Sequence, residues 1–232
     1  MKLRVSPFGK WIVWLLILLT GRFHSGMAQN FDRGIVKLPE PRYESESSIE
    51  KCLLLRRSVR DFKDEPLTLA QISQLLWAAQ GVTSAEGFKT APSAGATYPL
   101  EAYLVAGHVT DLQSGIYQFS SSKHELTRIV DGDKREELAR AALGQYSVRE
   151  AAAIIVFSAV YERTTAQYGD RGVMYVHMEA GHAAQNVALQ AVAQDLGTIM
   201  IGAFEDDEVK VLMKMEDEEA PVYLIAVGVP QL

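Results

Sequence analysis

The sequence predicts an α+β fold in which helices pack around one mixed sheet. Three features favour this class: an amphipathic helical pattern near residue 70, a long alanine-rich helical pattern near residue 185, and apolar runs of strand length on both sides of the long helix. The order of these elements along the chain favours one sheet with helices packed on it.

The composition is that of a globular protein. The chain has 232 residues, of which 48% are hydrophobic and 22% charged, so we expect a single domain with a sizeable core. This domain is expected at residues 48–232, after a polar linker or surface arm at residues 29–47. The only cysteine, Cys52, cannot form an internal disulfide and lies in an apolar run, where a buried structural thiol is expected rather than a reactive one.

Residues 1–28 have the pattern of a secretory signal peptide. Basic residues precede an apolar run at residues 11–19, and Gly26, Met27 and Ala28 place small residues where a signal peptidase cleaves. We therefore expect an exported protein, periplasmic or extracellular. Because the apolar run is shorter than the roughly 20 residues that span a bilayer, an uncleaved N-terminal membrane anchor is the alternative.

The charge of the expected mature chain is strongly negative. Removal of residues 1–28 takes away four of the 23 basic side chains and none of the 29 acidic ones, which leaves 19 basic residues and a formal charge of −10. Such a surface repels nucleic acid and anionic lipid. No nucleic-acid partner is expected.

The first part of the domain is expected to be helical. One helix is predicted at about residues 48–57 and a second at residues 68–80. The second has Thr68 and Gln71 at capping-box spacing, an apolar stripe of helical period, and Gly81 at the C′ position.

The remaining elements alternate between strands and helices. Strands are expected at residues 101–106, 153–160 and 222–229, with a hairpin at residues 115–119 and 125–130. Helices are expected at residues 133–143 with Asp133 as N-cap, 175–196 ended by Gly197, and 206–215. The strand at 153–160 alternates too little to be half exposed, so it is expected in the centre of the sheet. The helix at 175–196 is small and apolar on several faces, which is typical of a helix buried against another subunit.

A basic cluster follows the first helix. Arg56, Arg57, Ser58 and Arg60 lie within five residues of an otherwise acidic chain and can converge on one anion. Guanidinium groups bind phosphate through paired hydrogen bonds, and a serine hydroxyl adds a donor. The alternative is a solvated basic helix end that the helix dipole favours.

A turn of small residues is the second candidate site. Pro92, Ser93, Ala94 and Gly95 offer backbone amides with little side-chain bulk, so this loop can lie against a flat ring and donate hydrogen bonds to it. The alternative is an ordinary tight turn. A serine hydrolase is not expected, because Ala91 stands where the Gly-x-Ser-x-Gly motif needs glycine.

Two further segments contain side chains that could take part in chemistry. Residues 167–172, which include Tyr168, favour either a loop near a pocket or a turn with an Asp–Arg pair. His177 and His182 are five residues apart on a helix and do not share a face, so no metal site is expected. A buried, hydrogen-bonded ring is expected for either histidine.

Taken together, these segments resemble the nitroreductase-like flavoproteins, and most closely the SagB-type dehydrogenase branch. The matching segments, in family order, are residues 56–60, 75–81, 91–101, 168–172, 179–186 and 201–204. The resemblance implies a nitroreductase-like mixed sheet surrounded by helices, with FMN bound at a homodimer interface.

The resemblance also implies roles for the candidate residues. Arg56, Arg57, Ser58 and Arg60 would hold the FMN phosphate. Pro92, Ser93, Ala94 and Gly95 would come from the partner subunit and face the isoalloxazine ring, while Ile201 and Gly202 would lie along its other side. The helix at 175–196 would be the central helix of the dimer.

One position departs from the SagB-type pattern. Azoline dehydrogenases of this branch carry a Lys-Tyr pair for proton transfer, and here Gln167 stands at the lysine position while Tyr168 is retained. Because glutamine cannot act as a base, oxidation of peptide azolines is in question. Tyr168 is the candidate proton donor or substrate-orienting group.

The implied activity is that of an FMN-dependent oxidoreductase exchanging a hydride between flavin N5 and a small-molecule or peptide-derived substrate. Nicotinamide donors are scarce outside the cytoplasm, which favours substrate-driven dehydrogenation or a membrane-linked electron partner. The alternatives are an NAD(P)H-dependent nitro or quinone reductase, a non-catalytic or flavin-consuming FMN-binding protein, and a domain that never binds flavin.

Overall fold

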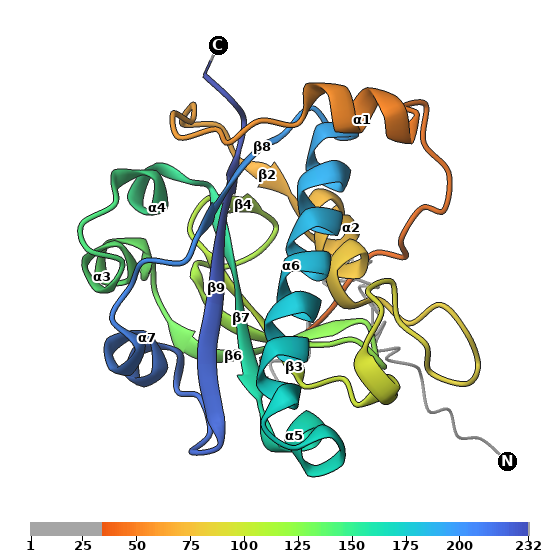
Figure 1. Cartoon of the computed structure of the whole chain (residues 1–232). Coiled ribbons are helices and arrows are strands. Elements are labelled where there is room, and N and C mark those ends of the chain that lie inside the picture. The colour runs from red at the N-terminus through yellow and green to blue at the C-terminus, as the bar shows by residue number, and fades with distance from the viewer. Residues whose placement is uncertain (1–33, 232) are drawn as a thin grey trace, which may run out of the picture. The chain divides into compact units, whose positions relative to one another are not determined.

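The computed structural model describes residues 34–231, so the expected signal peptide and residues 29–33 lie outside the described residues. Its main element is a seven-stranded sheet of order β1-β6-β5-β3-β7-β9-β8 (Figure 1). Neighbouring strands of this sheet are antiparallel. In the described residues, parallel pairing is confined to β2 with β4 and to a bridge between Ser58 and Thr198 at the β8 edge. The expected α+β class is confirmed, but the seven strands of the sheet pair antiparallel and do not form the mixed sheet that was expected.

The elements have the following bounds. The strands are β1 (Ile35–Lys37), β2 (Leu67–Thr68), β3 (Leu100–Ala106), β4 (Val109–Thr110), β5 (Gly115–Ser120), β6 (Glu125–Asp131), β7 (Ala153–Val160), β8 (Gly197–Ile201) and β9 (Glu219–Gly228). The helices are α1 (Ile49–Leu55), α2 (Leu69–Gln80), α3 (Arg135–Ala141), α4 (Tyr146–Glu150), α5 (Glu162–Tyr168), α6 (Arg171–Val192) and α7 (Asp206–Met213), with a 3-10 turn η1 (Ala94–Ala96).

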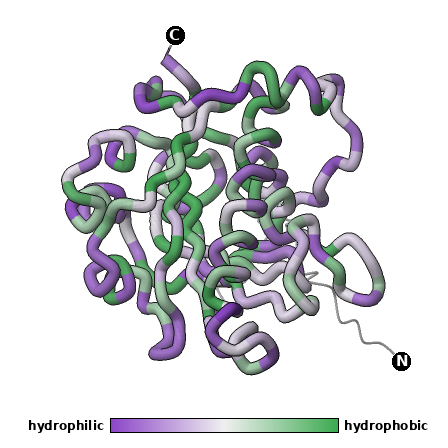
Figure 2. Tube along the Cα trace, viewed as in Figure 1, coloured by the Kyte–Doolittle hydropathy of each residue, from purple (hydrophilic) through white to green (hydrophobic). Residues whose placement is uncertain are grey.

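Helices cover both faces of the sheet. Ile155 and Phe157 of β7 pack with α2 and α6 in one core, whereas Ile154 and Val156 pack with α3, α4 and α7 in the other. Every residue of β7 is buried, and this strand lies between β3 and β9. The prediction of a central strand at 153–160 is therefore confirmed. Figure 2 shows the hydrophobic colour concentrated along these strands.

The helix α2 begins as predicted but ends differently. Thr68 and Gln71 form the reciprocal hydrogen bonds of a capping box. Gly81, however, is not in a left-handed conformation, because its φ is −61°. Glycine is required there for space: a Cβ atom would lie 2.1 Å from Cδ1 of Trp77.

Two other helix ends differ from the prediction. Asp133 is not the N-cap of α3; Lys134 holds that position, and the Asp133 carboxylate instead accepts hydrogen bonds from Arg135. The long helix α6 spans Arg171–Val192, so it starts and ends about four residues earlier than expected. Gly197 does not end it but begins β8.

Several elements were not expected from the sequence, chiefly β1, β8, α4 and α5. β1 pairs with the edge strand β6. Beyond it, Gln74 of α2 accepts from the backbone N–H of Arg42 and donates to its carbonyl, which fixes the segment before α1. Within residues 34–231, no helix is long and apolar enough to cross a membrane.

Candidate functional site

The arginine cluster lies at the end of α1. Ser48 caps the start of this helix by accepting from the backbone N–H of Lys51, and Cys52 is buried, as predicted. At the other end, Nη1 of Arg57 donates to the carbonyls of Leu54 and Arg56 at 2.9 and 2.7 Å. Arg57 thus occupies the helix end, in the position that the dipole interpretation expected.

These arginines have no acidic partner in the part of the chain that the structure describes. Within residues 34–231, Arg56, Arg57 and Arg60 form no ion pair, although the neighbouring Asp61 is hydrogen-bonded to Tyr146. Arg57 and Arg60 are exposed and Arg56 is half-buried. Three unneutralised guanidinium groups in five residues repel one another, and an anion would relieve this repulsion.

The cluster runs along the edge of the sheet. The backbone N–H of Val59 donates to Thr198 of β8 at 2.9 Å, beside the parallel bridge of Ser58 with Thr198. Gly197 allows this contact, since a Cβ atom there would lie 2.8 Å from side-chain carbons of Val59. Gly228 plays the same part for Phe62, also at 2.8 Å. We call residues 56–60 the arginine ledge.

Ile201 and Gly202 lie further along the same edge. They follow Thr198 by three and four residues, which is about 10–13 Å along an extended strand. Ile201 is buried, whereas Gly202 is exposed, and a Cβ atom at Gly202 would meet only Tyr223 at 3.9 Å. The surface above Gly202 is therefore open and continuous in sequence with the strand that holds the ledge.

The small-residue loop has a strained conformation. Gly95, Ala96 and Tyr98 have φ values of 59°, 53° and 45°. Such values cost energy for non-glycine residues and cluster at functional sites. At Gly95 a side chain is excluded for a second reason, because its Cβ atom would lie 2.6 Å from the hydroxyl of Tyr168 and 2.7 Å from Oε1 of Gln167. The structure thus brings Gly95, Gln167 and Tyr168 together.

Helix α5 anchors the loop. The hydroxyls of Thr97 and Thr164 are 2.8 Å apart, and Nη1 of Arg163 donates to the carbonyl of Tyr98 at 3.1 Å. Arg163 also pairs with Glu101 of β3 at 2.7 Å. The loop that carries Ser93 and Gly95 is therefore an ordered part of the fold.

The segment that carries the small-residue loop contacts both α5 and α6. At one end, a Cβ atom at Gly95 would meet the Tyr168 hydroxyl. Just before the loop, the Thr90 carbonyl accepts a hydrogen bond from Asn186 of α6 at 3.3 Å, and both residues line a hollow together with Cys52 of α1. Among the described residues, no hydrogen bond joins residues 92–95 to the arginine ledge of the same chain.

Exposed apolar residues occur on both α1 and α6. On α1, Leu53, Leu54 and Leu55 are exposed, Leu54 by 70%, and Figure 2 shows this hydrophobic run. On α6, Met174 and Met178 are exposed. Exposed apolar patches of this kind mark interaction sites.

Sequence reasoning did not single out Glu179 and Lys89 as partners of the loop. Glu179 of α6 is 3% exposed, and burial raises its pKa to about 6 against the opposing effects of Ser93 and Lys89. The feature of the sequence that could have drawn attention to Glu179 is a carboxylate within an alanine-rich helix. Burial of that position could not be read from the helix alone, because it depends on the loop that covers it.

The histidine prediction was wrong in one respect. His177 and His182 are both exposed rather than buried, and His177 is hydrogen-bonded to the hydroxyl of Tyr161 at 2.6 Å. In the part of the chain that the structure describes, no group of three or more His, Cys, Asp or Glu residues could hold a metal ion. The Asp–Arg pair expected for a turn at residues 167–172 does not form, since no ion pair among the described residues includes Asp170 or Arg171.

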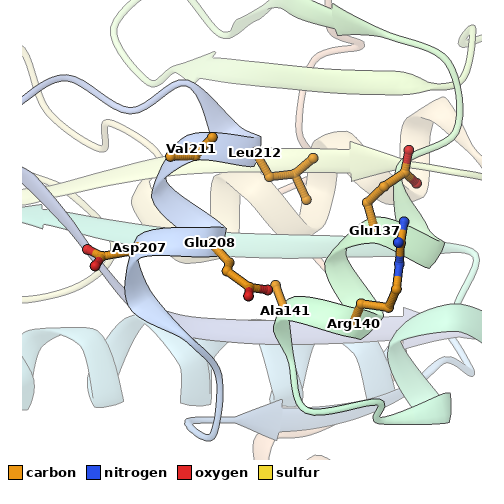
Figure 3. Close-up of a pocket in the computed structure, with 7 residues that line it drawn as sticks. All are labelled: Glu137, Arg140, Ala141, Asp207, Glu208, Val211 and Leu212. Atoms are coloured by element: carbon orange, nitrogen blue, oxygen red, sulfur yellow. The ribbon is translucent and has the colours of Figure 1, made fainter.

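A separate hollow lies between α3 and α7, with a volume of about 720 Å³. Figure 3 shows Glu137 and Arg140 on one side and Asp207, Glu208 and Leu212 on the other. None of the candidate residues lines it, and its helices cover the face of the sheet opposite to α6. It is not part of the candidate site.

Comparison with known proteins identifies relatives over most of the chain. The family model described as "Nitroreductase family" matches residues 53–229. A protein of Methanocaldococcus jannaschii whose name assigns it to the nitroreductases is 48% identical over 183 residues, or 79% of this chain and 91% of that protein. The trifolitoxin operon protein TfxC of Rhizobium leguminosarum is 24% identical over 192 residues, and an NADPH-flavin oxidoreductase of Vibrio harveyi is 29% identical over 132. The matches cover 76% and 52% of this chain but only 54% and 55% of those two proteins.

Solved structures of proteins from the same family resemble this fold. Crystal structures of proteins named as nitroreductases from Anabaena variabilis and Ralstonia eutropha match with TM-scores of 0.76 each, at 31% and 27% identity. They cover 85% and 86% of this chain, but 42% and 90% of their own chains. The NADPH:FMN oxidoreductase of Vibrio harveyi complexed with NAD+ matches with a TM-score of 0.58 at 22% identity, over 79% of this chain and 69% of that one, which indicates the shared fold.

Proposed function

This chain belongs to the nitroreductase family, and we propose that it is an FMN-dependent oxidoreductase of the SagB-type branch that exchanges a hydride between flavin N5 and a small-molecule or peptide-derived substrate. Membership implies oxidoreductase chemistry, and the family with its flavin-oxidoreductase relatives indicates FMN as the cofactor. The six segments that resemble the SagB-type branch and the similarity to TfxC support the narrower assignment.

The arginine ledge carries this proposal. Three arginines that form no ion pair within residues 34–231, together with the Ser58 hydroxyl, suit a phosphate. Beyond Ser58 and its partner Thr198, the open surface over Gly202 suits a flat ring, and the roughly 10–13 Å of strand from Thr198 to Gly202 is comparable with the length of FMN from its phosphate to the middle of its ring. The residues present therefore fit FMN at the β8 edge.

We further propose that the protein is a homodimer with two composite sites. Among the described residues, the loop at residues 92–95 forms no hydrogen bond with the ledge of its own chain, which leaves it available to the flavin site of a partner subunit. A twofold pairing through the exposed apolar residues of α1 and α6 would place the loop of one subunit over the ledge of its partner. Burial of that apolar surface would drive the pairing.

Within the site, the chain orients groups around the ring. FMN, when bound, supplies hydride-transfer chemistry that the side chains of the site do not offer. The backbone N–H groups of Ala94 and Gly95 donate no hydrogen bond among the described residues, so they are available to stabilise negative charge on the ring edge. The Tyr168 hydroxyl, next to Gly95, is positioned to donate a proton or to orient substrate. Gln167 beside it orients by hydrogen bonding but holds no exchangeable charge.

We propose an exported, periplasmic or extracellular location on the basis of the signal-peptide pattern in residues 1–28, with a membrane-linked electron partner in place of a soluble nicotinamide. The second candidate function is an NAD(P)H-dependent nitro or quinone reductase. It is supported by the names of the relatives from Methanocaldococcus and Vibrio, and by Gln167 in place of the azoline-dehydrogenase lysine.

The test is retention of flavin. The protein would be mixed with FMN, passed through a gel-filtration column and examined by visible absorption. We expect a flavin spectrum on a dimer-sized peak, loss of most of it in Arg57→Ala, and no change in Arg140→Ala, which removes an equally exposed arginine from α3. A colourless protein that does not quench FMN fluorescence would refute the proposal. Turnover of reduced nicotinamide with a nitro or quinone acceptor would favour the second candidate.

A further inference from the structure

Two residues at the start of α4 contact both ends of the proposed flavin site. Nε2 of Gln145 donates to the carbonyl of Ala203 at 3.0 Å, beside the open surface over Gly202. The hydroxyl of Tyr146 donates to Oδ1 of Asp61, the residue that follows the arginine ledge. The start of α4 therefore lies against both the ring end and the phosphate end of that site.

Asp61 directly follows the ledge but does not neutralise it. Within residues 34–231, none of the ledge arginines forms an ion pair with Asp61 or with any other acid. Elsewhere in this chain, opposite charges close in sequence do pair, as Arg135 and Asp133 do at 2.7 Å. The free ledge therefore needs a local cause.

The Tyr146 hydroxyl supplies that cause by fixing the direction of the Asp61 carboxylate. Oδ1 of Asp61 accepts the hydroxyl proton, while the backbone carbonyl of Asp61 accepts from the N–H of Gln231 at 2.9 Å. The hydrogen bond to Asp61 raises the pKa of the Tyr146 hydroxyl, which therefore remains a donor at neutral pH. To turn toward a guanidinium group, the carboxylate would have to give up this hydrogen bond.

An unrestrained Asp61 would compete with a phosphate for the same arginines. Carboxylate and phosphate both bind guanidinium groups through paired hydrogen bonds. Asp61 is attached to the ledge, so it would be present at every moment, and an incoming anion would have to displace it. Because these groups are exposed to solvent, the competition is worth a few-fold in affinity rather than orders of magnitude.

We propose that Tyr146 is a positioning residue of the phosphate end of the flavin site: by holding the Asp61 carboxylate, it keeps the arginine ledge free of an internal counter-ion. This inference rests on the proposed function, because a free ledge matters only if an anion binds there. It makes the anion affinity of the ledge depend on a side chain that forms no hydrogen bond with the ledge arginines among the described residues.

The test is a double-mutant cycle in the full chain. Fluorescence quenching gives the dissociation constants of FMN and of riboflavin, which lacks the phosphate, for the wild type, Tyr146→Phe, Asp61→Asn and the double variant. The control is Tyr43→Phe, which removes the hydroxyl of another exposed tyrosine, whose ring packs against Trp77 of α2. The informative comparison is the effect of Tyr146→Phe with and without the Asp61 charge.

We expect Tyr146→Phe to weaken FMN binding by about threefold, as for competition by one exposed ion pair, and to leave riboflavin binding unchanged. In the Asp61→Asn background the same substitution should change neither constant. Asp61→Asn alone should bind FMN at least as tightly as the wild type, since it removes the competing charge. Tyr43→Phe should match the wild type.

Four results would overturn the positioning role while leaving the proposed function intact. They are unchanged FMN affinity in Tyr146→Phe, an equal loss in the Asp61→Asn background, an equal loss for riboflavin, and weaker FMN binding by Asp61→Asn. A wild type that binds no FMN would overturn both the positioning role and the proposed function.

Discussion

Gly197→Ala should displace the arginine ledge although it replaces none of its arginines. The new Cβ atom would lie 2.8, 2.8 and 2.9 Å from Cβ, Cγ1 and Cγ2 of Val59, whereas ordinary contacts begin at 3.4 Å. The segment or the strand must therefore move by about 0.6 Å or more. Because Cβ of Val59 is fixed to the backbone, a change of rotamer cannot relieve the contact, and the hydrogen bond from Val59 to Thr198 is disturbed.

Overpacking of this kind costs about 1–3 kcal/mol. In urea, with a slope of about 1–3 kcal/mol per molar, this lowers the unfolding midpoint by roughly 1 M at an unchanged slope. FMN affinity should fall in the same variant, since the ledge residues move with Val59. Unfolding would be followed on protein without FMN, and affinity by fluorescence quenching.

Val59→Gly provides the control, because it removes all three opposing carbon atoms. In that background Gly197→Ala should cost little more, so the double variant should be more stable than the sum of the single changes predicts. An unchanged midpoint and unchanged FMN affinity in Gly197→Ala would refute the reasoning that glycine is needed at this position to seat the ledge.

Three further outcomes are expected. Glu179→Gln should stabilise the fold at high pH, because the pKa of Glu179 in the folded protein is raised from its ordinary 4.5 to about 6. As pH rises through this range, ionisation lowers the free energy of unfolding of the wild type by about 2 kcal/mol. Thermal melts of the wild type and the variant should therefore diverge between pH 4 and pH 8. Met178→Asp, at an exposed position of α6, should convert a dimer to a monomer in sedimentation or light scattering and reduce FMN retention with it; a dimer that persists would place the interface elsewhere. Tyr168→Phe should keep FMN but lower turnover by about 10²–10⁴-fold if the hydroxyl transfers a proton, as measured by steady-state kinetics once a substrate is found, and unaltered turnover would exclude that role.

The fold was predictable where local pattern decides it. The capping box at Thr68 and Gln71 and the unbroken apolar run of β7 each specify an element without reference to the rest of the chain. β8 was missed because its five residues begin with glycine and follow an alanine-rich helix, so no boundary separates them in sequence. The helix α5 was missed because its residues are largely polar and carry no apolar stripe.

The candidate site also combines features that the sequence shows with features that only the fold shows. The arginines and the small-residue loop stand out in sequence because charge and glycine content are local properties. Their supports are not local: the bridge between Ser58 and Thr198 joins residues 140 positions apart, and the burial of Glu179 depends on a loop some 86 residues before it. Such pairings follow only from the assembled sheet and helices.

The bridge at the ledge has a consequence for the order of folding. Residues 58–63 are held by Thr198 at one end and by the segment after β9 at the other, where Phe62 is bridged to Pro230 and the backbone N–H of Lys63 donates to Val229. A chain that emerges N-terminus first exposes its arginines early but cannot seat them until residues 198 and 229–230 have been made. Contacts of such long sequence separation form late and slowly. Acquisition of cofactor would therefore be a late event, and bound flavin would report that both ends of this domain have folded together.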